Sequence, residues 1–161
     1  MNSTVFDARL IHPFSMVVYG PSQSGKSTFI FDLLQNASRL INVQFDYIIC
    51  FVGSNDMKYL GLKAIYGNRI DFVRGLPKDL NAFIKPGLKG FLIFDDLMME
   101  ATKSAAVTEI FIHRCHHENL SVALLLQDLF AKGRDRLTIL RSTHYLVLFK
   151  NPLDQVINYI I

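Results

Sequence analysis

The stretch GPSQSGKST, from Gly20 to Thr28, follows directly on the apolar run FSMVVY. It fits the pattern G-x-x-x-x-G-K-[ST], in which Gly20, Gly25, Lys26 and Ser27 take the defining positions. Glycine lets the backbone turn without a clash from a Cβ atom, so successive N–H groups can point toward one place. A helix that begins at this turn adds the partial positive charge of its N-terminus. The stretch therefore predicts a strand, a phosphate-binding turn and a helix, in that order.

Apolar runs alternate with mixed stretches along the whole chain, which predicts an α/β fold. The runs expected to form strands lie at 14–20, 45–52, 70–73, 90–96, 121–127 and 144–150. Helices are expected at 26–40, at 76–84, at 103–117 and at 135–140. Strands that are apolar throughout are typical of a parallel sheet with helices on both faces. We expect a mostly parallel sheet in a single domain that spans residues 1–161.

The composition indicates a folded intracellular protein. Half of the 161 residues are hydrophobic and 19% are charged, which excludes a disordered chain. The net charge of +3 is compatible with nucleic acid but does not require it. Cys50 and Cys115 are far apart and fit no disulfide framework. No membrane span or signal peptide is evident, so we expect neither membrane association nor secretion. The apolar ending LDQVINYII raises the hypothesis of a chain truncated at its C-terminus.

The lysine and the serine of the turn indicate its ligand. Lys26 is expected to reach the β- and γ-phosphates of a nucleoside triphosphate, and Ser27 to offer its hydroxyl to Mg²⁺. ATP and Mg²⁺ are therefore the expected cofactors. The expected ATP-binding residues are Gly20, Pro21, Ser22, Gln23, Ser24, Gly25, Lys26, Ser27 and Thr28. The alternative is a glycine-rich turn between a strand and a helix that binds nothing.

Two acidic residues end the apolar run GFLIFDD. Asp95 and Asp96 follow four apolar residues, and acidic side chains at the carboxyl end of a central parallel strand lie beside the phosphate-binding turn. Asp95 is expected to hold Mg²⁺ together with Ser27. Asp96 is expected to act as the general base that polarises an attacking water. The alternative is an aspartate pair that caps a helix after the strand.

Gln127 ends another apolar run, SVALLLQ. An amide at this place can contact the γ-phosphate or its water and sense which nucleotide is bound. Lys26, Asp96 and Gln127 are therefore the expected catalytic residues. The alternative for Gln127 is a loop amide that caps the following helix.

Four segments together resemble the genome-packaging ATPases of the HerA–FtsK superfamily: GPSQSGKST, FLIFDDLM, HRCHHENLSVALLLQDLF and THYLVLFKNP. The likeness is to the packaging ATPases of Polinton/Maverick elements, adintoviruses and related double-stranded DNA viruses, with those of poxviruses more distant. It extends from Phe14 to Asp154. The phosphate-binding turn is generic to P-loop NTPases, whereas the histidine pair before the strand that ends in Gln127, and the final FKNP, are more specific.

The resemblance implies a P-loop NTPase fold of the RecA/FtsK type and Mg²⁺-dependent ATP hydrolysis. It also implies a homo-oligomeric ring that moves double-stranded DNA into a shell of capsid protein. Residue by residue, it gives phosphate-binding roles to Gly20–Thr28, metal and base roles to Asp95 and Asp96, and a sensor role to Gln127. A viral protein of this kind is expected inside the cell, in the host nucleus or at the site of virus assembly.

The resemblance further implies an arginine that acts on the ATP of a neighbouring subunit. Ser142 stands where the family often has asparagine, and Leu137 stands where many members have arginine. These departures leave the arginine open among Arg114, Arg134, Arg136 and Arg141.

Two other groups of polar residues have alternative interpretations. His113, Cys115, His116 and His117 are a weak pattern for zinc, because no further cysteine or carboxylate has suitable spacing. A polar helix end near the nucleotide, or a contact between subunits, is the favoured interpretation. The segment KGRDR, residues 132–136, fits a phosphate-contacting loop and a solvated loop equally well.

Three functions compete for these residues. A DNA motor is favoured by the paired aspartates, by Gln127 and by the family-like end of the chain. A nucleotide kinase, or another small P-loop NTPase that does not act on DNA, is disfavoured because no arginine-rich lid is evident. An inactive integrated copy that only binds nucleotide would fit a truncated chain. The intact Lys26, Ser27, Asp95 and Asp96 argue against such decay.

Overall fold

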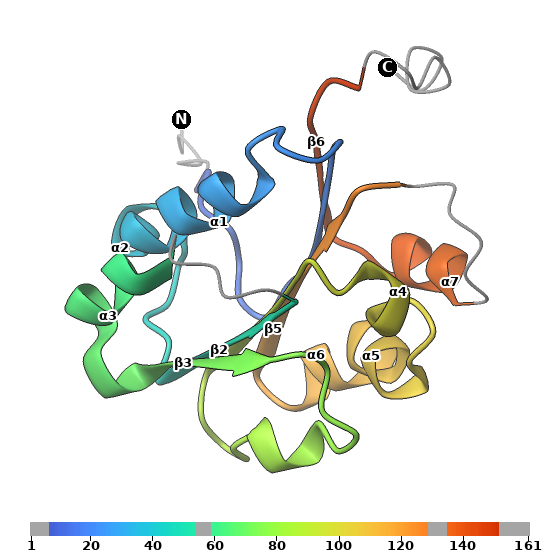
Figure 1. The fold of residues 1–161 in the computed structure, drawn as a ribbon. Coiled ribbons are helices and arrows are strands. Elements are labelled where there is room, and N and C mark those ends of the chain that lie inside the picture. The colour runs from blue at the N-terminus through green and yellow to red at the C-terminus, as the bar shows by residue number, and fades with distance from the viewer. Residues whose placement is uncertain (1–6, 54–58, 129–134, 152–161) are drawn as a thin grey trace, which may run out of the picture.

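The computed structural model describes residues 7–53, 59–128 and 135–151 (Figure 1). Within these ranges, six strands form one sheet in the order β3-β2-β4-β5-β1-β6, and every neighbouring pair is parallel. The α/β fold with a parallel sheet is thereby confirmed. The strands are β1 (Ser15–Tyr19), β2 (Tyr47–Val52), β3 (Ile70–Arg74), β4 (Gly90–Asp95), β5 (Leu120–Leu126) and β6 (Tyr145–Leu148).

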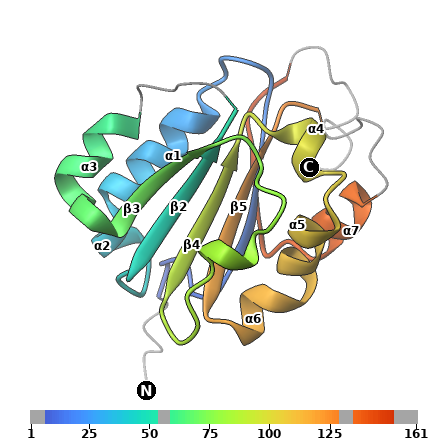
Figure 2. The same cartoon turned by 60° about the horizontal axis from the view of Figure 1, so that its bottom comes forward.

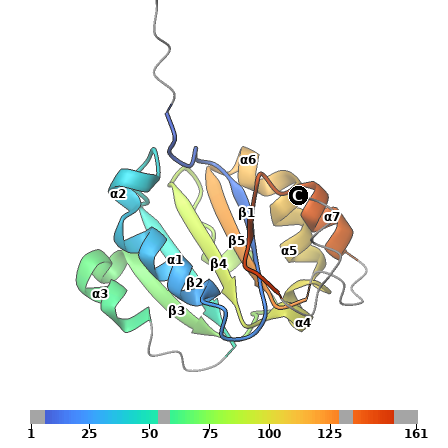
Figure 3. The same ribbon diagram turned by 90° about the horizontal axis from the view of Figure 1, so that it is seen from above.

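Helices cover both faces of the sheet, as Figures 2 and 3 show from two directions. One face carries α1 (Lys26–Gln35), α2 (Ala37–Leu40) and α3 (Leu60–Tyr66). The other face carries α4 (Met98–Ala101), α5 (Ala105–Glu109), the π-helical turn η4 (Ile110–Arg114), α6 (Cys115–His117) and α7 (Arg136–Arg141). Two short 3-10 turns, η2 (Gly67–Arg69) and η3 (Asn81–Phe83), lie on either side of β3 in the chain.

The central strands β1, β2, β4 and β5 are almost entirely apolar because each faces a hydrophobic core on both sides. Phe91 and Ile93 of β4 pack into the core beneath α1 and α3. Leu92 and Phe94 of the same strand pack into the core beneath α5 and η4. All four side chains are fully buried. The two cores hold the sheet rigidly between its helices and fix where each strand ends.

The helix predicted over 26–40 is interrupted. α1 ends at Gln35, Asn36 has φ −108° and ψ 18°, and α2 begins at Ala37. The Asn36 side chain donates a hydrogen bond to the Asp32 carbonyl at 2.9 Å. Asparagine side chains that bond the backbone in this way compete with continuation of a helix, which explains the break.

The helix predicted over 76–84 is wrong, since only Asn81–Phe83 form a 3-10 turn. The Asp79 side chain accepts a hydrogen bond from the N–H two residues later at 2.9 Å. This local bond closes a turn and satisfies the backbone without a longer helix. Leu80 and Ile84 on either side of the turn are buried in the core, so their helix-like spacing reflects burial of a loop.

Sequence patterns did not indicate α3 or α4. α3 has no side-chain cap and contains Gly61, which lowers helix propensity. α4 is only four residues long. Short helices of this kind, without caps, leave too few residues for a periodic signal.

The helix predicted over 103–117 is present from Ala105 and continues through η4 and α6 to His117. Ser104 Oγ caps its start by accepting from the Val107 N–H at 3.3 Å.

Both cysteines are free and buried. Burial raises the pKa values of the Cys50 and Cys115 thiols. Both thiols therefore stay protonated and shielded at neutral pH. In the parts of the chain that the structure describes, no helix has the length and apolar character needed to cross a membrane.

A buried histidine joins the amino ends of the central strands. His12 Nδ1 lies 2.7 Å from Ser121 Oγ, and Nε2 lies 3.0 Å from Asn119 Oδ1. Ser121 Oγ also accepts from the Phe14 N–H at 3.1 Å. In a neutral ring, Nε2–H donates to Asn119 Oδ1 and Nδ1 accepts from the Ser121 hydroxyl, so both ring nitrogens have a partner. Burial lowers the pKa of His12, against a smaller raising effect of the hydrogen bond to Asn119.

We expect the free energy of unfolding to fall as the pH decreases from about 7.5 to about 5.5. Because folding lowers the pKa of His12, its stabilising contribution is complete above the unfolded value of 6.5 and is lost as the pH falls through the folded value. Urea denaturation at the two pH values measures this loss. His12→Asn should show a smaller loss, whereas His113→Asn, at an exposed histidine, should keep the wild-type loss. Equal losses for the wild type and His12→Asn would contradict this account.

Candidate nucleotide-binding site

The candidate residues follow the carboxyl ends of neighbouring strands at one edge of the sheet. The phosphate-binding turn, residues 20–28, follows β1, Asp95 ends β4 with Asp96 next to it, and Gln127 follows β5. β4, β5 and β1 lie side by side in the sheet. Because parallel strands end at the same edge, the turn, the two aspartates and the amide come together there.

The backbone of the phosphate-binding turn is wound into a concave path. Gln23 has φ 60° and Gly25 has φ 101°, both in the left-handed region. At Gly25 an added Cβ would meet only the Phe149 ring at 3.5 Å, so the φ angle rather than the space requires glycine. Gly25 is the N-cap of α1, which has no side-chain cap bond and no acidic residue in its first turn. The N-terminal N–H groups of α1 are therefore available to an anion.

Lys26 lies inside the turn with only 7% of its surface exposed. Its Nζ donates to the Gly20 carbonyl at 2.7 Å and to the Pro21 carbonyl at 2.8 Å. Ser24 Oγ is buried in the same turn and has no hydrogen-bond partner among the described residues. The hollow at the turn has a volume of about 200 Å³ and is lined by Gln23, Gly25, Lys26, Ser27 and Thr28. A buried ammonium group and an unpaired hydroxyl fit a phosphate ligand.

The two aspartates have different environments. Asp95 is 6% exposed, and its Oδ2 accepts a hydrogen bond of 2.5 Å from the Tyr59 hydroxyl. Asp96 is exposed, has a left-handed φ of 57°, and its Oδ1 accepts from Gln127 Nε2 at 3.3 Å. The structure thus brings Asp96 and Gln127 into contact. One carboxylate is buried and held, and the other can meet a water molecule.

Ser27 and Asp95 are the side chains that would hold a metal, and Tyr59 contacts Asp95. Hydroxyl and carboxylate oxygens are the ligands that Mg²⁺ prefers. Tyr59 donates to Asp95, and Ser27 lies close enough to Tyr59 to affect its pKa. These residues fit Mg²⁺ bound together with a nucleotide. Over residues 7–53, 59–128 and 135–151, no group of three or more His, Cys, Asp or Glu side chains could hold a metal ion.

Sequence analysis did not indicate Tyr59. It precedes α3, is 1% exposed, and its ring stacks on the ring of Phe72 in β3 with 6.0 Å between centroids. Burial raises the pKa of Tyr59 far above its usual range, and the negative charge of Asp95 raises it further. The hydroxyl therefore stays protonated and donates to the carboxylate. A single tyrosine before a short helix gives no local pattern from which this role could be predicted.

The end of β2 supports the aspartates from the other side. The Gly53 N–H donates to the Asp95 carbonyl at 3.0 Å. A Cβ atom at Gly53 would lie 2.2 Å from the Asp96 carbonyl oxygen, which is a backbone atom and cannot rotate away. The backbone at Gly53 thus fixes the position of both aspartates.

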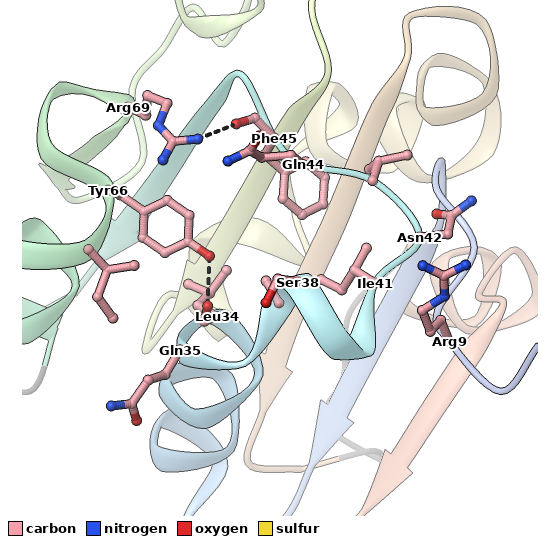
Figure 4. A pocket seen from close by; sticks show the side chains of 13 residues that line it. Arg9, Leu34, Gln35, Ser38, Ile41, Asn42, Gln44, Phe45, Tyr66 and Arg69 are labelled. Atoms are coloured by element: carbon pink, nitrogen blue, oxygen red, sulfur yellow. Dashed lines mark hydrogen bonds between the residues drawn. The ribbon is translucent and has the colours of Figure 1, made fainter.

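A larger hollow of about 410 Å³ lies at the far end of α1 (Figure 4). There Tyr66 donates to the Leu34 carbonyl at 2.6 Å, and Arg69 lies 3.5 Å from the Phe45 carbonyl. None of the site residues predicted from the sequence lines it. The larger volume would favour this hollow over the one at the phosphate-binding turn as the ligand site. The lining residues favour the turn, because only there, among the described residues, do a buried lysine and backbone N–H groups of a helix start meet.

The histidine cluster and Arg114 lie at the opposite edge of the sheet from the turn. α6 ends at His117, three residues before β5 begins, so this helix end is at the amino edge. Its expected position near the nucleotide is wrong, because the amino ends of parallel strands lie at the edge opposite the site, and a contact between subunits stays a prediction. Arg114 donates to Glu118 at 2.9 Å and to Asn81 at 2.7 Å.

The other candidate arginines lie near α7. Arg136 begins this helix and Arg141 ends it, with Arg141 exposed. Arg134 and most of the KGRDR segment lie outside the described residues. The arginine that acts on a neighbouring subunit thus stays a prediction.

A parallel sheet with the turn after β1 and the carboxylates at the end of β4 is an α/β fold of the P-loop NTPase type. No family model matches the chain, and no curated protein matches it. Two solved structures share its fold, each over 92% of this chain and 82% of the other. One is the genome packaging NTPase B204 from Sulfolobus turreted icosahedral virus 2 in complex with ATP-γS, at 19% identity and a TM-score of 0.56. The other is the DNA-packaging ATPase B204 from Sulfolobus turreted icosahedral virus, at 16% identity and a TM-score of 0.58.

Gly53→Ala should disable the site without removing any candidate side chain. The new Cβ would force the Asp96 backbone to move, and a displacement of about 1 Å can cost about 100-fold in rate. We expect ATP hydrolysis to fall at least about tenfold. Gly61→Ala is the matched control, since its Cβ would meet only the Phe31 ring at 3.4 Å. Wild-type hydrolysis by folded Gly53→Ala protein would contradict the positioning of Asp96 by β2.

Proposed function

We propose that this protein is an Mg²⁺-dependent ATPase motor that moves double-stranded DNA into a viral capsid. The observation that carries the proposal is the contact between Asp96 and Gln127 beside a phosphate-binding turn that holds a buried lysine. This arrangement is typical of an NTPase that senses and hydrolyses its γ-phosphate. The fold supports the biological role, because it is shared with two viral genome-packaging NTPases.

The charged groups of the turn would neutralise the phosphates. Lys26 Nζ, now shared between two carbonyl oxygens, would exchange them for phosphate oxygens, which form stronger, charge-assisted hydrogen bonds. The N–H groups at the start of α1 add the favourable end of the helix dipole. Mg²⁺, which Ser27 and Asp95 would hold, would supply further positive charge to the phosphates.

The exposed carboxylate would supply the base. Asp96 lies where water can reach it and would accept a proton from the attacking water. Gln127 contacts one oxygen of that carboxylate, which restrains its orientation and leaves the amide carbonyl of Gln127 free to orient the same water. Hydrolysis of the γ-phosphate would thereby be sensed at the end of β5 through the Gln127 side chain.

The proposal also includes the assembly. A homo-oligomeric ring would surround the DNA and dock on capsid protein, in the host nucleus or at the site of virus assembly. Arg134, Arg136 and Arg141 stay candidates for the arginine that acts on a neighbour's ATP. Arg114 is disfavoured because Glu118 and Asn81 already hold its guanidinium group. The likeness to Polinton and adintovirus packaging ATPases rests on the four sequence segments quoted above.

The test is the rate of ATP hydrolysis with Mg²⁺, with and without long double-stranded DNA. We expect a basal rate that rises several-fold with DNA. Lys26→Ala should lower both rates at least about 100-fold, because it removes a preorganised charge at the phosphates. Lys78→Ala, which removes an exposed lysine from the loop after β3, is the matched control and should keep both rates.

Two outcomes would contradict the motor. A Lys26-dependent rate that is indifferent to DNA would instead support a small NTPase or kinase that does not act on DNA. Nucleotide binding without any Lys26-dependent hydrolysis would support an inactive copy.

A further inference from the structure

Tyr59 is buried at the centre of the site, yet it belongs to no motif. Its hydroxyl donates to Asp95 Oδ2 at 2.5 Å, between two side chains that are 1% and 6% exposed. A hydrogen bond from a hydroxyl to a carboxylate at this length is charge-assisted and among the stronger ones in proteins. Asp95 Oδ1 makes no hydrogen bond with a described residue.

The tyrosine is also fixed by its own surroundings. The ring belongs to the core beneath α1 and α3 and stacks on Phe72. The donor therefore cannot follow the carboxylate if the carboxylate rotates. Asp95 is restrained through one oxygen, and the other oxygen keeps one orientation relative to the phosphate-binding turn.

We propose that Tyr59 is a positioning residue: it holds the Asp95 carboxylate in the orientation in which this side chain would bind Mg²⁺ together with ATP. This inference rests on the proposed function. Groups that orient metal ligands by hydrogen bonding typically change metal affinity about 10- to 100-fold when they are removed. Tyr59 itself touches neither substrate nor reacting atoms in this account.

The test is nucleotide binding rather than turnover. Binding of a fluorescent, non-hydrolysable ATP analogue to the full chain is measured in EDTA and over a series of Mg²⁺ concentrations. We expect Tyr59→Phe to raise the Mg²⁺ concentration for half-maximal tightening at least about tenfold, with unchanged affinity in EDTA. Mn²⁺ binding to the nucleotide complex, followed by electron paramagnetic resonance, should weaken in parallel.

Tyr66→Phe is the matched control. Tyr66 is also buried and also donates its hydroxyl, to the Leu34 carbonyl at 2.6 Å, at the far end of α1. Loss of this donor should leave the Mg²⁺ dependence as in the wild type. Should Tyr59→Phe fold poorly, Tyr59→Phe in an Asp95→Asn background supplies the second measurement. If Tyr59 acts through Asp95, the second substitution should add no further loss of Mg²⁺ affinity beyond that of Asp95→Asn.

Each contrary outcome overturns a different statement. If the wild type needs Mg²⁺ for tight binding and Tyr59→Phe needs the same concentration, the positioning role is wrong and the proposed function stands. The role is equally wrong if Tyr59→Phe lowers the Mg²⁺ requirement, since the hydroxyl would then compete with the metal. If the wild type does not bind the nucleotide, or binds it without regard to Mg²⁺, the proposed function fails and this inference fails with it.

Discussion

The parallel pairing of β1 with β5, and of β5 with β4, is the constraint on which the candidate site depends. Parallel strands end at one edge, so the turn, the aspartates and Gln127 meet there although long stretches of chain separate them. The Gly20 N–H donates to the Leu126 carbonyl at 3.1 Å and extends the β1–β5 ladder into the turn. This bond fixes the position of the turn, along the strand direction, relative to Gln127. A change of strand order would separate these groups without altering any of them.

Two charges are buried at this edge, and each has a polar partner before any ligand arrives. Two backbone carbonyls hold the Lys26 ammonium group, and the Tyr59 hydroxyl holds the Asp95 carboxylate. Burying a charge without such partners would cost several kcal/mol, on the order of the stability of a whole domain. The partners also keep the charged groups in fixed places, so little reorganisation is left for the moment of binding.

The sequence predicts the parts of the site that depend on local spacing. The turn is recognisable because glycine, lysine and serine stand at fixed offsets after a strand, and Asp95 and Asp96 because they end an apolar run. Tyr59 is different, since its partner lies 36 residues away and no periodic pattern relates the two. The wrong helix over 76–84 has a similar origin, because burial of a loop imitates helical spacing. The number of domains and the roles of the individual site residues stay predictions.

The edge strands of the described sheet bear on whether separate molecules can aggregate by strand pairing. An edge strand presents unpaired N–H and C=O groups on which another chain can pair and start an aggregate. β6 at one edge is only four residues long, and β3 at the other edge exposes the charged side chains of Asp71 and Arg74. Both features discourage strands of separate molecules from pairing. In a chain that is half hydrophobic, these edges make pairing between the sheets of separate molecules less favourable than long, flat, apolar edge strands would.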